Sequence, residues 1–365
     1  MTKRVLIIGG YGNFGSYITE TLAQEDLIIC IAGRSQLKCE NLISVIRNNL
    51  HPIEYSVFDI TSSLPLNEIS PDIVIHTSGP FQEQGYDVAK ECIEYGCHYI
   101  DLSDGRNFVL DIKTLDQKAS DAGVFVISGA SSVPCLSSAV IDHYKKEFNL
   151  LDRVEYAIAT AQQTNRGLAT TASILGYTGK PFKTLVKGKM IEVFGWQDLN
   201  FHTYPQFGIR PLGNCEIPDL SLFPIRYPEL KTIRFYAGTE IKFMHIGLWF
   251  LSWLVRFGII SNLRPAAKFF IKIANFFDWM GTSNSAFHMK LSGEDEDNNA
   301  KHKTIYILAK EGDGPFIPCA PAIILTKMFA DNQYIKPGAF PCIGLIDLTT
   351  YMKQLRGLNI NLIEE

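Results

Sequence analysis

The sequence predicts an α/β protein, with a doubly wound parallel sheet at the N-terminus and a second, mixed α/β (α+β) domain after it. Strand-like and helix-like stretches alternate over about the first 130 residues, which implies right-handed crossovers and a parallel sheet covered on both faces. After about residue 150, strands such as residues 287–292 alternate apolar and polar side chains, a pattern typical of a half-buried antiparallel sheet. A chain of 365 residues is long enough for two hydrophobic cores.

The first part opens with an apolar run at residues 4–8, which predicts a buried strand, and residues 13–24 then carry a helical pattern. Helical periodicity is also clear at residues 86–95 and 107–122, where apolar side chains recur three and four positions apart. Further strands are expected at residues 27–32, 54–58, 72–76, 98–100 and 124–128.

A glycine-rich turn joins the first strand to the first helix. Gly10, Gly12 and Gly15 form a GxGxxG pattern, in which glycines let the turn close, let the backbone approach a pyrophosphate and let the helix pack on the strand. The helix N-terminus adds backbone N–H groups and the positive end of the helix dipole. The pattern predicts a Rossmann domain with a dinucleotide site, and the alternative is a turn without a ligand. The residues expected to bind the dinucleotide here are Gly10, Tyr11, Gly12, Asn13, Phe14 and Gly15.

The end of the second strand indicates which dinucleotide binds. An Asp or Glu at this position would accept hydrogen bonds from the ribose 2′-hydroxyl of NAD, but the sequence carries Gly33, Arg34 and Ser35. Arg34 can pair with a 2′-phosphate and Ser35 can donate a hydrogen bond to it. These residues predict NADP(H) in preference to NAD(H); the alternative is that Arg34 is an ordinary surface arginine.

Three further strand ends are expected to line the same site, because open α/β sheets bind ligands at the carboxyl ends of their strands. Asp59 and Ile60 follow the third strand, on the adenine side. A serine pair after the sixth strand is expected near the nicotinamide or the substrate, although the pair could simply form a turn. The remaining cofactor candidates are Ser78, Gly79 and Pro80 after the fourth strand, and Ser131 and Ser132, the serine pair after the sixth.

These motifs together resemble the saccharopine dehydrogenase-like superfamily, in its NADP-binding-domain branch. The resemblance rests on GGYGNFG at residues 9–15, AGRS at 32–35, SGPF at 78–81, CIEYGCHYIDLSDG at 92–105, SGASSVPCLSSAV at 128–140 and GDGPFIPCAPAIILTKMF at 312–329. It implies an oxidoreductase with a Rossmann domain at residues 1–130 that the C-terminal segment 320–365 completes. Residues 131–319 would form a substrate and dimerisation domain. Cys135 departs from the glycine that the family commonly carries.

Catalytic residues are harder to identify, because hydride transfer needs only positioning and a proton donor or acceptor. Asp101 and Asp104 follow the fifth strand, where either could hold a substrate amine or transfer a proton, and either could instead cap a turn or helix. Arg166 could hold an anionic substrate group or be a surface residue. His143 and His202 are expected to be structural. No metal-binding pattern is present, and no metal is expected.

Residues 243–280 are rich in aromatic and aliphatic side chains. The uninterrupted apolar run is about half the length that a membrane span requires, so two packed helices are the preferred interpretation. The alternative is a hydrophobic substrate site or peripheral membrane contact through residues 243–280. The charged run at residues 294–303 is expected to be a solvated hairpin loop.

Composition limits the partners. A formal charge of −4 without any Lys/Arg-rich block argues against nucleic acid. Eight scattered cysteines without a CxxC pair are typical of buried free thiols, and the apolar run after Met1 is too short for a signal peptide, so a cytoplasmic location is expected. A homodimer is expected because symmetric dimers are the commonest oligomers.

The leading hypothesis is therefore an NADP-dependent oxidoreductase that transfers a hydride to or from a C–N, C–O or activated C=C bond of a small metabolite. One alternative is a non-catalytic NADP-binding scaffold or redox sensor. Another is an enoyl or lipid-type reductase that associates with a membrane surface.

Overall fold

The computed structural model describes residues 2–365, which form two compact units. Unit 1 runs up to Ala139 and includes Pro315–Gln354; unit 2 comprises Val140–Gly314 and Leu355–Glu365. The chain thus enters unit 2 about nine residues later than the expected boundary at residue 130, and its last eleven residues lie in unit 2 rather than with the Rossmann part.

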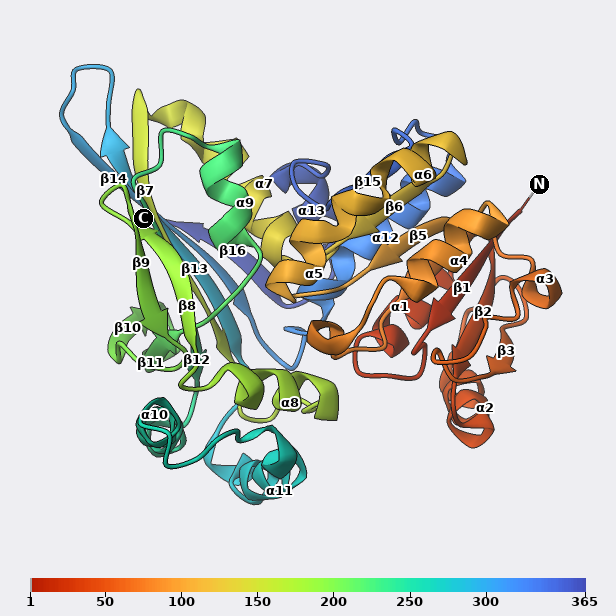
Figure 1. The fold of residues 1–365 in the computed structure, drawn as a ribbon, viewed down its shortest axis with the longest axis horizontal. Helices are drawn as coiled ribbons and strands as arrows, with labels where there is room; N and C mark the ends of the chain where they lie inside the picture. The colour runs from red at the N-terminus through yellow and green to blue at the C-terminus, as the bar shows by residue number, and fades with distance from the viewer. Residues whose placement is uncertain (1) are drawn as a thin grey trace. The chain divides into compact units, whose positions relative to one another are not determined.

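Unit 1 is built on a seven-stranded parallel sheet in the order β15-β6-β5-β4-β1-β2-β3 (Figure 1). Six of these strands have the 3-2-1-4-5-6 order of a Rossmann domain, which confirms the predicted fold class. The seventh comes from the C-terminal return of the chain. The strands are β1 (Lys3–Ile8), β2 (Leu27–Gly33), β3 (Glu54–Val57), β4 (Ile73–His76), β5 (His98–Asp101), β6 (Phe125–Ser128) and β15 (Gly338–Pro341).

Helices cover both faces of this sheet (Figure 1). On one face, α3 and α4 pack against buried side chains of the strands. On the other, α12 contacts α1: the rings of Tyr17 and Phe316 lie 4.4 Å apart and the Cys319 thiol lies 3.5 Å from the Phe14 carbonyl oxygen. The helices are α1 (Gly15–Leu22), α2 (Gln36–Val45), α3 (Leu66–Ile69), α4 (Asp87–Tyr95), α5 (Arg106–Asp111), α6 (Asp116–Asp121), α12 (Phe316–Ala330) and α13 (Leu348–Gln354); α7 (Ser137–Tyr144) leads into unit 2.

The helical periodicity predicted at residues 107–122 corresponds to two helices, α5 and α6, rather than one. A 3-10 turn at Ile112–Leu115 separates α5 from α6 and turns both of its end residues into the core. Asp116 then accepts a hydrogen bond from the Ala339 N–H at 2.9 Å, so the break also anchors β15. The periodicity of the segment is continuous and gives no sign of this interruption.

Unit 2 contains a seven-stranded mixed sheet in the order β10-β11-β12-β7-β13-β14-β16, and a separate β8–β9 hairpin. The expected antiparallel pairing holds except between β7 and β12, which are parallel. The predicted hairpin loop at 294–303 is shorter than expected, because β13 and β14 extend into it. The strands are β7 (Leu150–Thr160), β8 (Pro181–Val186), β9 (Lys189–Phe194), β10 (Asn200–Tyr204), β11 (Gly208–Asn214), β12 (Thr232–Thr239), β13 (Ser285–Glu294), β14 (Ala300–Ala309) and β16 (Ile360–Glu364).

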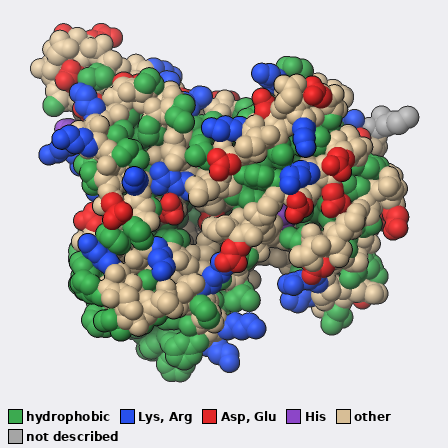
Figure 2. All heavy atoms as spheres, viewed as in Figure 1, with side chains coloured by type: hydrophobic (Ala, Val, Ile, Leu, Met, Phe, Trp, Pro, Cys, Tyr) green, Lys and Arg blue, Asp and Glu red, His purple; other side chains and the backbone are tan. Residues whose placement is uncertain are grey.

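Four helices accompany this sheet: α8 (Leu168–Tyr177), α9 (Asp219–Arg226), α10 (Lys242–Arg256) and α11 (Ala267–Phe276). The predicted helices in the apolar segment are therefore present, as α10 and α11. The two helices are packed on one side only: hydrophobic side chains also gather on the surface at the end of unit 2 that carries them (Figures 1 and 2). None of the helices among residues 2–365 is both long and apolar enough to cross a membrane.

Candidate functional site

The glycine turn between β1 and α1 is closed so tightly that side chains do not fit. The Gly12 N–H donates to the Gly9 carbonyl oxygen at 2.7 Å, and the Ser16 N–H donates to the Gly12 carbonyl oxygen at 3.0 Å. A Cβ atom on Gly15 would lie 2.2 Å from the Gly9 oxygen, and one on Gly10 would lie 2.7 Å from the Cβ atom of Ile31 on β2. The turn therefore requires these glycines, and it leaves the N-terminus of α1 without a side-chain cap. Such a cradle fits the pyrophosphate of a dinucleotide.

Tyr11 extends from this turn to the end of β2. Its hydroxyl oxygen accepts hydrogen bonds from the N–H groups of Arg34 at 2.8 Å and Ser35 at 3.2 Å. Its ring lies over Gly33, where a Cβ atom would come within 2.5 Å of it. These contacts bring two distant parts of the expected cofactor site together. The sequence offers no signal for them, because the role of Tyr11 depends on packing across the sheet edge.

The Arg34 guanidinium at this position remains available to a ligand. The Arg34 side chain is 80% exposed, and its nearest carboxylate, on Asp59, is 3.9 Å away. Hydrogen bonds from Thr61 hold the pKa of Asp59 below its usual range, so Asp59 is ionised at neutral pH. An exposed ion pair at this distance contributes little free energy, and a phosphate could replace the carboxylate as the partner of Arg34. Ser35 caps α2, its hydroxyl accepting the Lys38 N–H at 3.4 Å.

The other predicted strand ends lie along the same carboxyl edge of the sheet. Ser78 lies beside the glycine turn, where a Cβ atom on Gly9 would be 2.6 Å from its hydroxyl oxygen. Gly79 and Pro80 follow it, half-buried and joined by a cis peptide bond. Ile60 is half-buried and packs on the core of unit 1, so it offers at most an apolar contact.

The serine pair after β6 divides into two environments. Ser131 is partly accessible, whereas Ser132 is 8% exposed and begins a buried π-helical turn, Ser132–Leu136. A hydrogen bond with Ser132 slightly offsets the strong rise that burial causes in the pKa of Tyr351. Cys135 is enclosed in the same turn. Of the pair, Ser131 is therefore the one with access to a ligand.

Asp101 is enclosed in unit 1. One carboxylate oxygen accepts hydrogen bonds from the N–H groups of Ser103 and Gly129 and from the Ser128 hydroxyl, all at 2.9 Å. Burial raises the pKa of Asp101 to about 6 in spite of these bonds. Asp101 therefore ties the end of β5 to the end of β6, and its side chain, 0% exposed, has no access to a substrate.

Asp104 and Arg166 differ in availability. The Asp104 side chain is exposed, and its carboxylate accepts a hydrogen bond from the Gln82 amide at 3.0 Å. The Arg166 guanidinium, in unit 2, donates to Asn275 at 2.9 Å and forms an ion pair with Asp278 at 2.8 Å. It thus links the loop before α8 to the end of α11, and its charge already has a carboxylate partner. Local sequence could not predict this pairing, because Asp278 lies 112 residues further along the chain.

Unit 2 holds a second polar network that sequence reasoning missed. Arg210 is 1% exposed; its guanidinium donates to the Asn284 carbonyl oxygen at 2.8 Å and lies 3.4 Å from the Glu240 carboxylate. Glu240 also accepts the N–H groups of Gln162 and Thr282, each at 2.9 Å. The network joins β7, β11 and the loops around them, so its role is to order unit 2.

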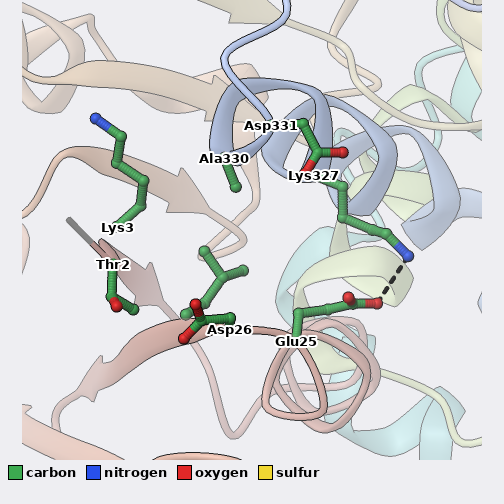
Figure 3. A pocket seen from close by; sticks show the side chains of 8 residues that line it. Thr2, Lys3, Glu25, Asp26, Lys327, Ala330 and Asp331 are labelled. Atoms are coloured by element: carbon green, nitrogen blue, oxygen red, sulfur yellow. Dashed lines mark hydrogen bonds and ion pairs between the residues drawn. The ribbon is translucent and has the colours of Figure 1, made fainter.

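A surface cavity of about 430 Å³ lies at the opposite edge of the unit 1 sheet (Figure 3). Thr2, Lys3 and Leu27 mark the starts of β1 and β2, and Lys327 forms an ion pair with Glu25 at 2.7 Å across it. Because parallel strands place their carboxyl ends at one edge, this cavity is remote from the glycine turn. It is not part of the cofactor site.

Comparison with known proteins supports the cofactor site. Residues 5–127 match the family model described as the saccharopine dehydrogenase NADP binding domain. The human saccharopine dehydrogenase-like oxidoreductase is 26% identical over 317 residues, which cover 74% of this chain and 73% of that protein. A lipid droplet localized protein of Caenorhabditis elegans is 26% identical over 198 residues, 50% of this chain and 44% of that protein.

The fold has a full-length counterpart among solved structures. The apo saccharopine dehydrogenase (L-Glu forming) of Saccharomyces cerevisiae superposes with a TM-score of 0.69, over 100% of both chains, at 14% identity. The predicted resemblance is therefore confirmed: the N-terminal residues match the saccharopine dehydrogenase NADP binding domain, the relatives are saccharopine dehydrogenase-like oxidoreductases, and the fold matches over the full length.

Proposed function

We propose that the chain is an NADP(H)-preferring oxidoreductase that transfers a hydride to or from a C–N, C–O or activated C=C bond of a small metabolite. The observation that carries this proposal is the exposed guanidinium of Arg34 at the end of β2, where an NAD-binding domain carries a carboxylate. Arg34 and Ser35 would hold the 2′-phosphate, and the turn from Gly10 to Gly15 would hold the pyrophosphate.

The nicotinamide end would lie along Ser78–Pro80 and Ser131 in this proposal. Bound NADP(H) would supply the hydride, so the chain has only to orient the cofactor, bind the substrate and exchange a proton. Asp104 is an exposed carboxylate beside this edge, and we assign it the role of binding a substrate amine or of transferring the proton. Asp101 and Arg166 are assigned structural roles, because their side chains are enclosed or already paired.

Calorimetric titration with NADPH and NADH tests the cofactor assignment. We expect wild-type protein to bind NADPH more tightly, and Arg34→Ala to weaken NADPH binding about tenfold while leaving NADH unchanged, because a charge-assisted contact with the 2′-phosphate is lost. Arg47→Ala removes another exposed arginine of unit 1 and serves as the control. Equal loss for both cofactors would contradict NADP preference, and absence of binding would contradict the cofactor site.

Deuterium transfer separates an enzyme from a non-catalytic NADP-binding scaffold or sensor. We expect stereospecific transfer from labelled NADPH to at least one member of a panel of amino-acid-derived imines, ketones and enoyl esters. An Asp104→Asn variant should retain NADPH binding and lose turnover. Tight NADPH binding without transfer to any member would favour the scaffold.

A lipophilic substrate is a second candidate, favoured by the name of the Caenorhabditis elegans relative and by the apolar surface of unit 2. In that case turnover of enoyl esters should rise with acyl chain length, whereas a small polar substrate would give no such trend. The cytoplasmic location and the homodimer remain predictions from the sequence, and sedimentation equilibrium tests the latter.

A further inference from the structure

The helices α10 and α11 expose large apolar side chains in unit 2. Phe250 is 57% exposed, Phe257 69%, Phe276 73% and Trp279 76%. Figure 2 shows hydrophobic side chains gathered over this end of the unit, with Lys and Arg at their edge. We call this surface the aromatic face, and it consists of Phe243, Ile246, Phe250, Phe257, Phe269, Phe276 and Trp279.

Both helices depart from the usual amphipathic arrangement, because large apolar side chains occupy their outer side as well as their inner one. The buried side of α10, which packs against β11 and β12, includes the polar residues His245 and Ser252. The buried residues of α11 are two alanines, Ala267 and Ala274. A surface helix of a globular protein normally turns its large apolar side chains toward the core and its polar ones toward water. The outward stripe of Phe and Ile is therefore suited to a second, non-aqueous partner.

The charges around the aromatic face identify the partner. Residues 242–280 carry five cationic side chains and one acidic one, although the whole chain has a formal charge of −4. Lys268 and Lys272 are exposed and alternate along α11 with Phe269 and Phe276. The single acid, Asp278, is paired with Arg166. Aromatic side chains flanked by long cationic ones are typical of helices that lie in the plane of an anionic membrane surface.

A second copy of the chain fits this surface less well, because lysine is depleted in the cores of protein interfaces. We propose that the aromatic face docks on a phospholipid surface that contains anionic lipids. Phe250, Phe269, Phe276 and Trp279 enter the acyl boundary, and Lys268 and Lys272 contact the headgroups. With 15 residues, α10 is too short to span a bilayer and lies along it.

Flotation with phosphatidylcholine vesicles, with and without phosphatidylserine, tests this proposal. Wild-type protein should float with the anionic vesicles and at least tenfold less with neutral ones. Phe269→Ser/Phe276→Ser should lose at least tenfold in vesicle partition, and Lys268→Glu/Lys272→Glu should lose the preference for anionic lipid. Tyr334→Ser and Lys113→Glu/Lys118→Glu remove an exposed ring and two exposed cations from unit 1 and should behave as wild type.

Tryptophan fluorescence gives a second readout of the same contact. Emission should shift to the blue when anionic vesicles are added, and Trp279→Phe should remove most of the shift, because Trp279 is the most exposed residue of the aromatic face. The proposal would be overturned if folded protein neither floats with vesicles nor shows the shift in emission. It would also be overturned if the protein forms a dimer that only the Phe269→Ser/Phe276→Ser variant loses. NADPH titration is independent of either result.

Discussion

Unit 1 and unit 2 each combine a seven-stranded sheet with helices, yet the chemical character of their surfaces differs. The ligand edge of unit 1 is made of glycines, small polar side chains and the exposed cation of Arg34. Unit 2 buries polar groups, including Arg210 and His288, which stacks on the half-buried His202, and it exposes aromatic ones. Similar layer architecture can therefore provide a charged, pre-formed site in one unit and an apolar surface in the other.

The units also differ in how far apart in the sequence their paired strands lie. Unit 1 joins successive parallel strands through short crossovers, so its site is assembled from turns whose local sequence is informative. In unit 2, β7 pairs with β12 and β13, both far along the chain. Its polar clusters therefore depend on contacts that no local pattern records.

The largest expected effect comes from adding a side chain to the glycine turn. Gly15→Val should abolish NADPH binding, because its Cβ atom would overlap the backbone oxygen of Gly9, and should lower the melting temperature. Gly247→Ala on α10 is the matched change in unit 2, where the new atom meets open space. It should raise stability by about 0.5–1 kcal/mol through helix propensity. Titration and thermal unfolding check both variants, and NADPH binding by Gly15→Val would contradict the assigned role of the turn.

Acidification should affect the two units unequally. Burial lowers the pKa values of His202 and His245 in unit 2 to about 4, and that of His288 well below its usual value. Because the unfolded chain binds these protons first, each of the three histidines destabilises unit 2 as the pH falls from about 6.5 toward 4; for His202 and for His245 the loss is on the order of 2 kcal/mol.

Unit 1 has histidines of the same kind and one group of opposite sign. The pKa values of His76 and His98 are also lowered to about 4, but that of Asp101 is raised to about 6, so protonation of Asp101 favours the folded state over the same interval. Hydrogen exchange at pH 7 and pH 5 should therefore show a larger loss of protection in β10 and β13 than in β4 and β5. Asp101→Asn should remove the stabilisation that protonation of Asp101 provides. The stability of unit 1 should then fall more between pH 7 and pH 5 than it does in the wild-type protein. Equal losses in both units would contradict this account.

The smallest expected effect concerns Tyr11. Its hydroxyl occupies the N–H groups of Arg34 and Ser35, so a 2′-phosphate that uses these donors must displace it. Tyr11→Phe should then tighten NADPH binding by about three- to tenfold, the scale of one or two net hydrogen bonds, and leave NADH unchanged. Tyr17→Phe removes a hydroxyl from α1 and is the control. Weaker NADPH binding in Tyr11→Phe would indicate that the hydroxyl contacts the cofactor instead.

Local sequence patterns were sufficient to predict the features that depend on local chemistry. The GxGxxG turn, the arginine at the end of the second strand and the alternation of strands and helices predicted the Rossmann domain, since each depends on neighbouring residues and on the periods of strand and helix. The strand-end positions of Asp59, Ser78 and Ser131 followed from the same rule.

Which of the predicted site residues are accessible to a ligand depends on tertiary packing. Asp101 and Asp104 stand three positions apart, yet one is enclosed by β6 and the other is exposed. Arg166 is occupied by a carboxylate from a distant helix. In α10 and α11 aromatic residues occur around much of the helix circumference, so periodicity could not determine which of them face the rest of unit 2. Burial depends on contacts between segments far apart in the chain, and local sequence patterns do not encode those contacts.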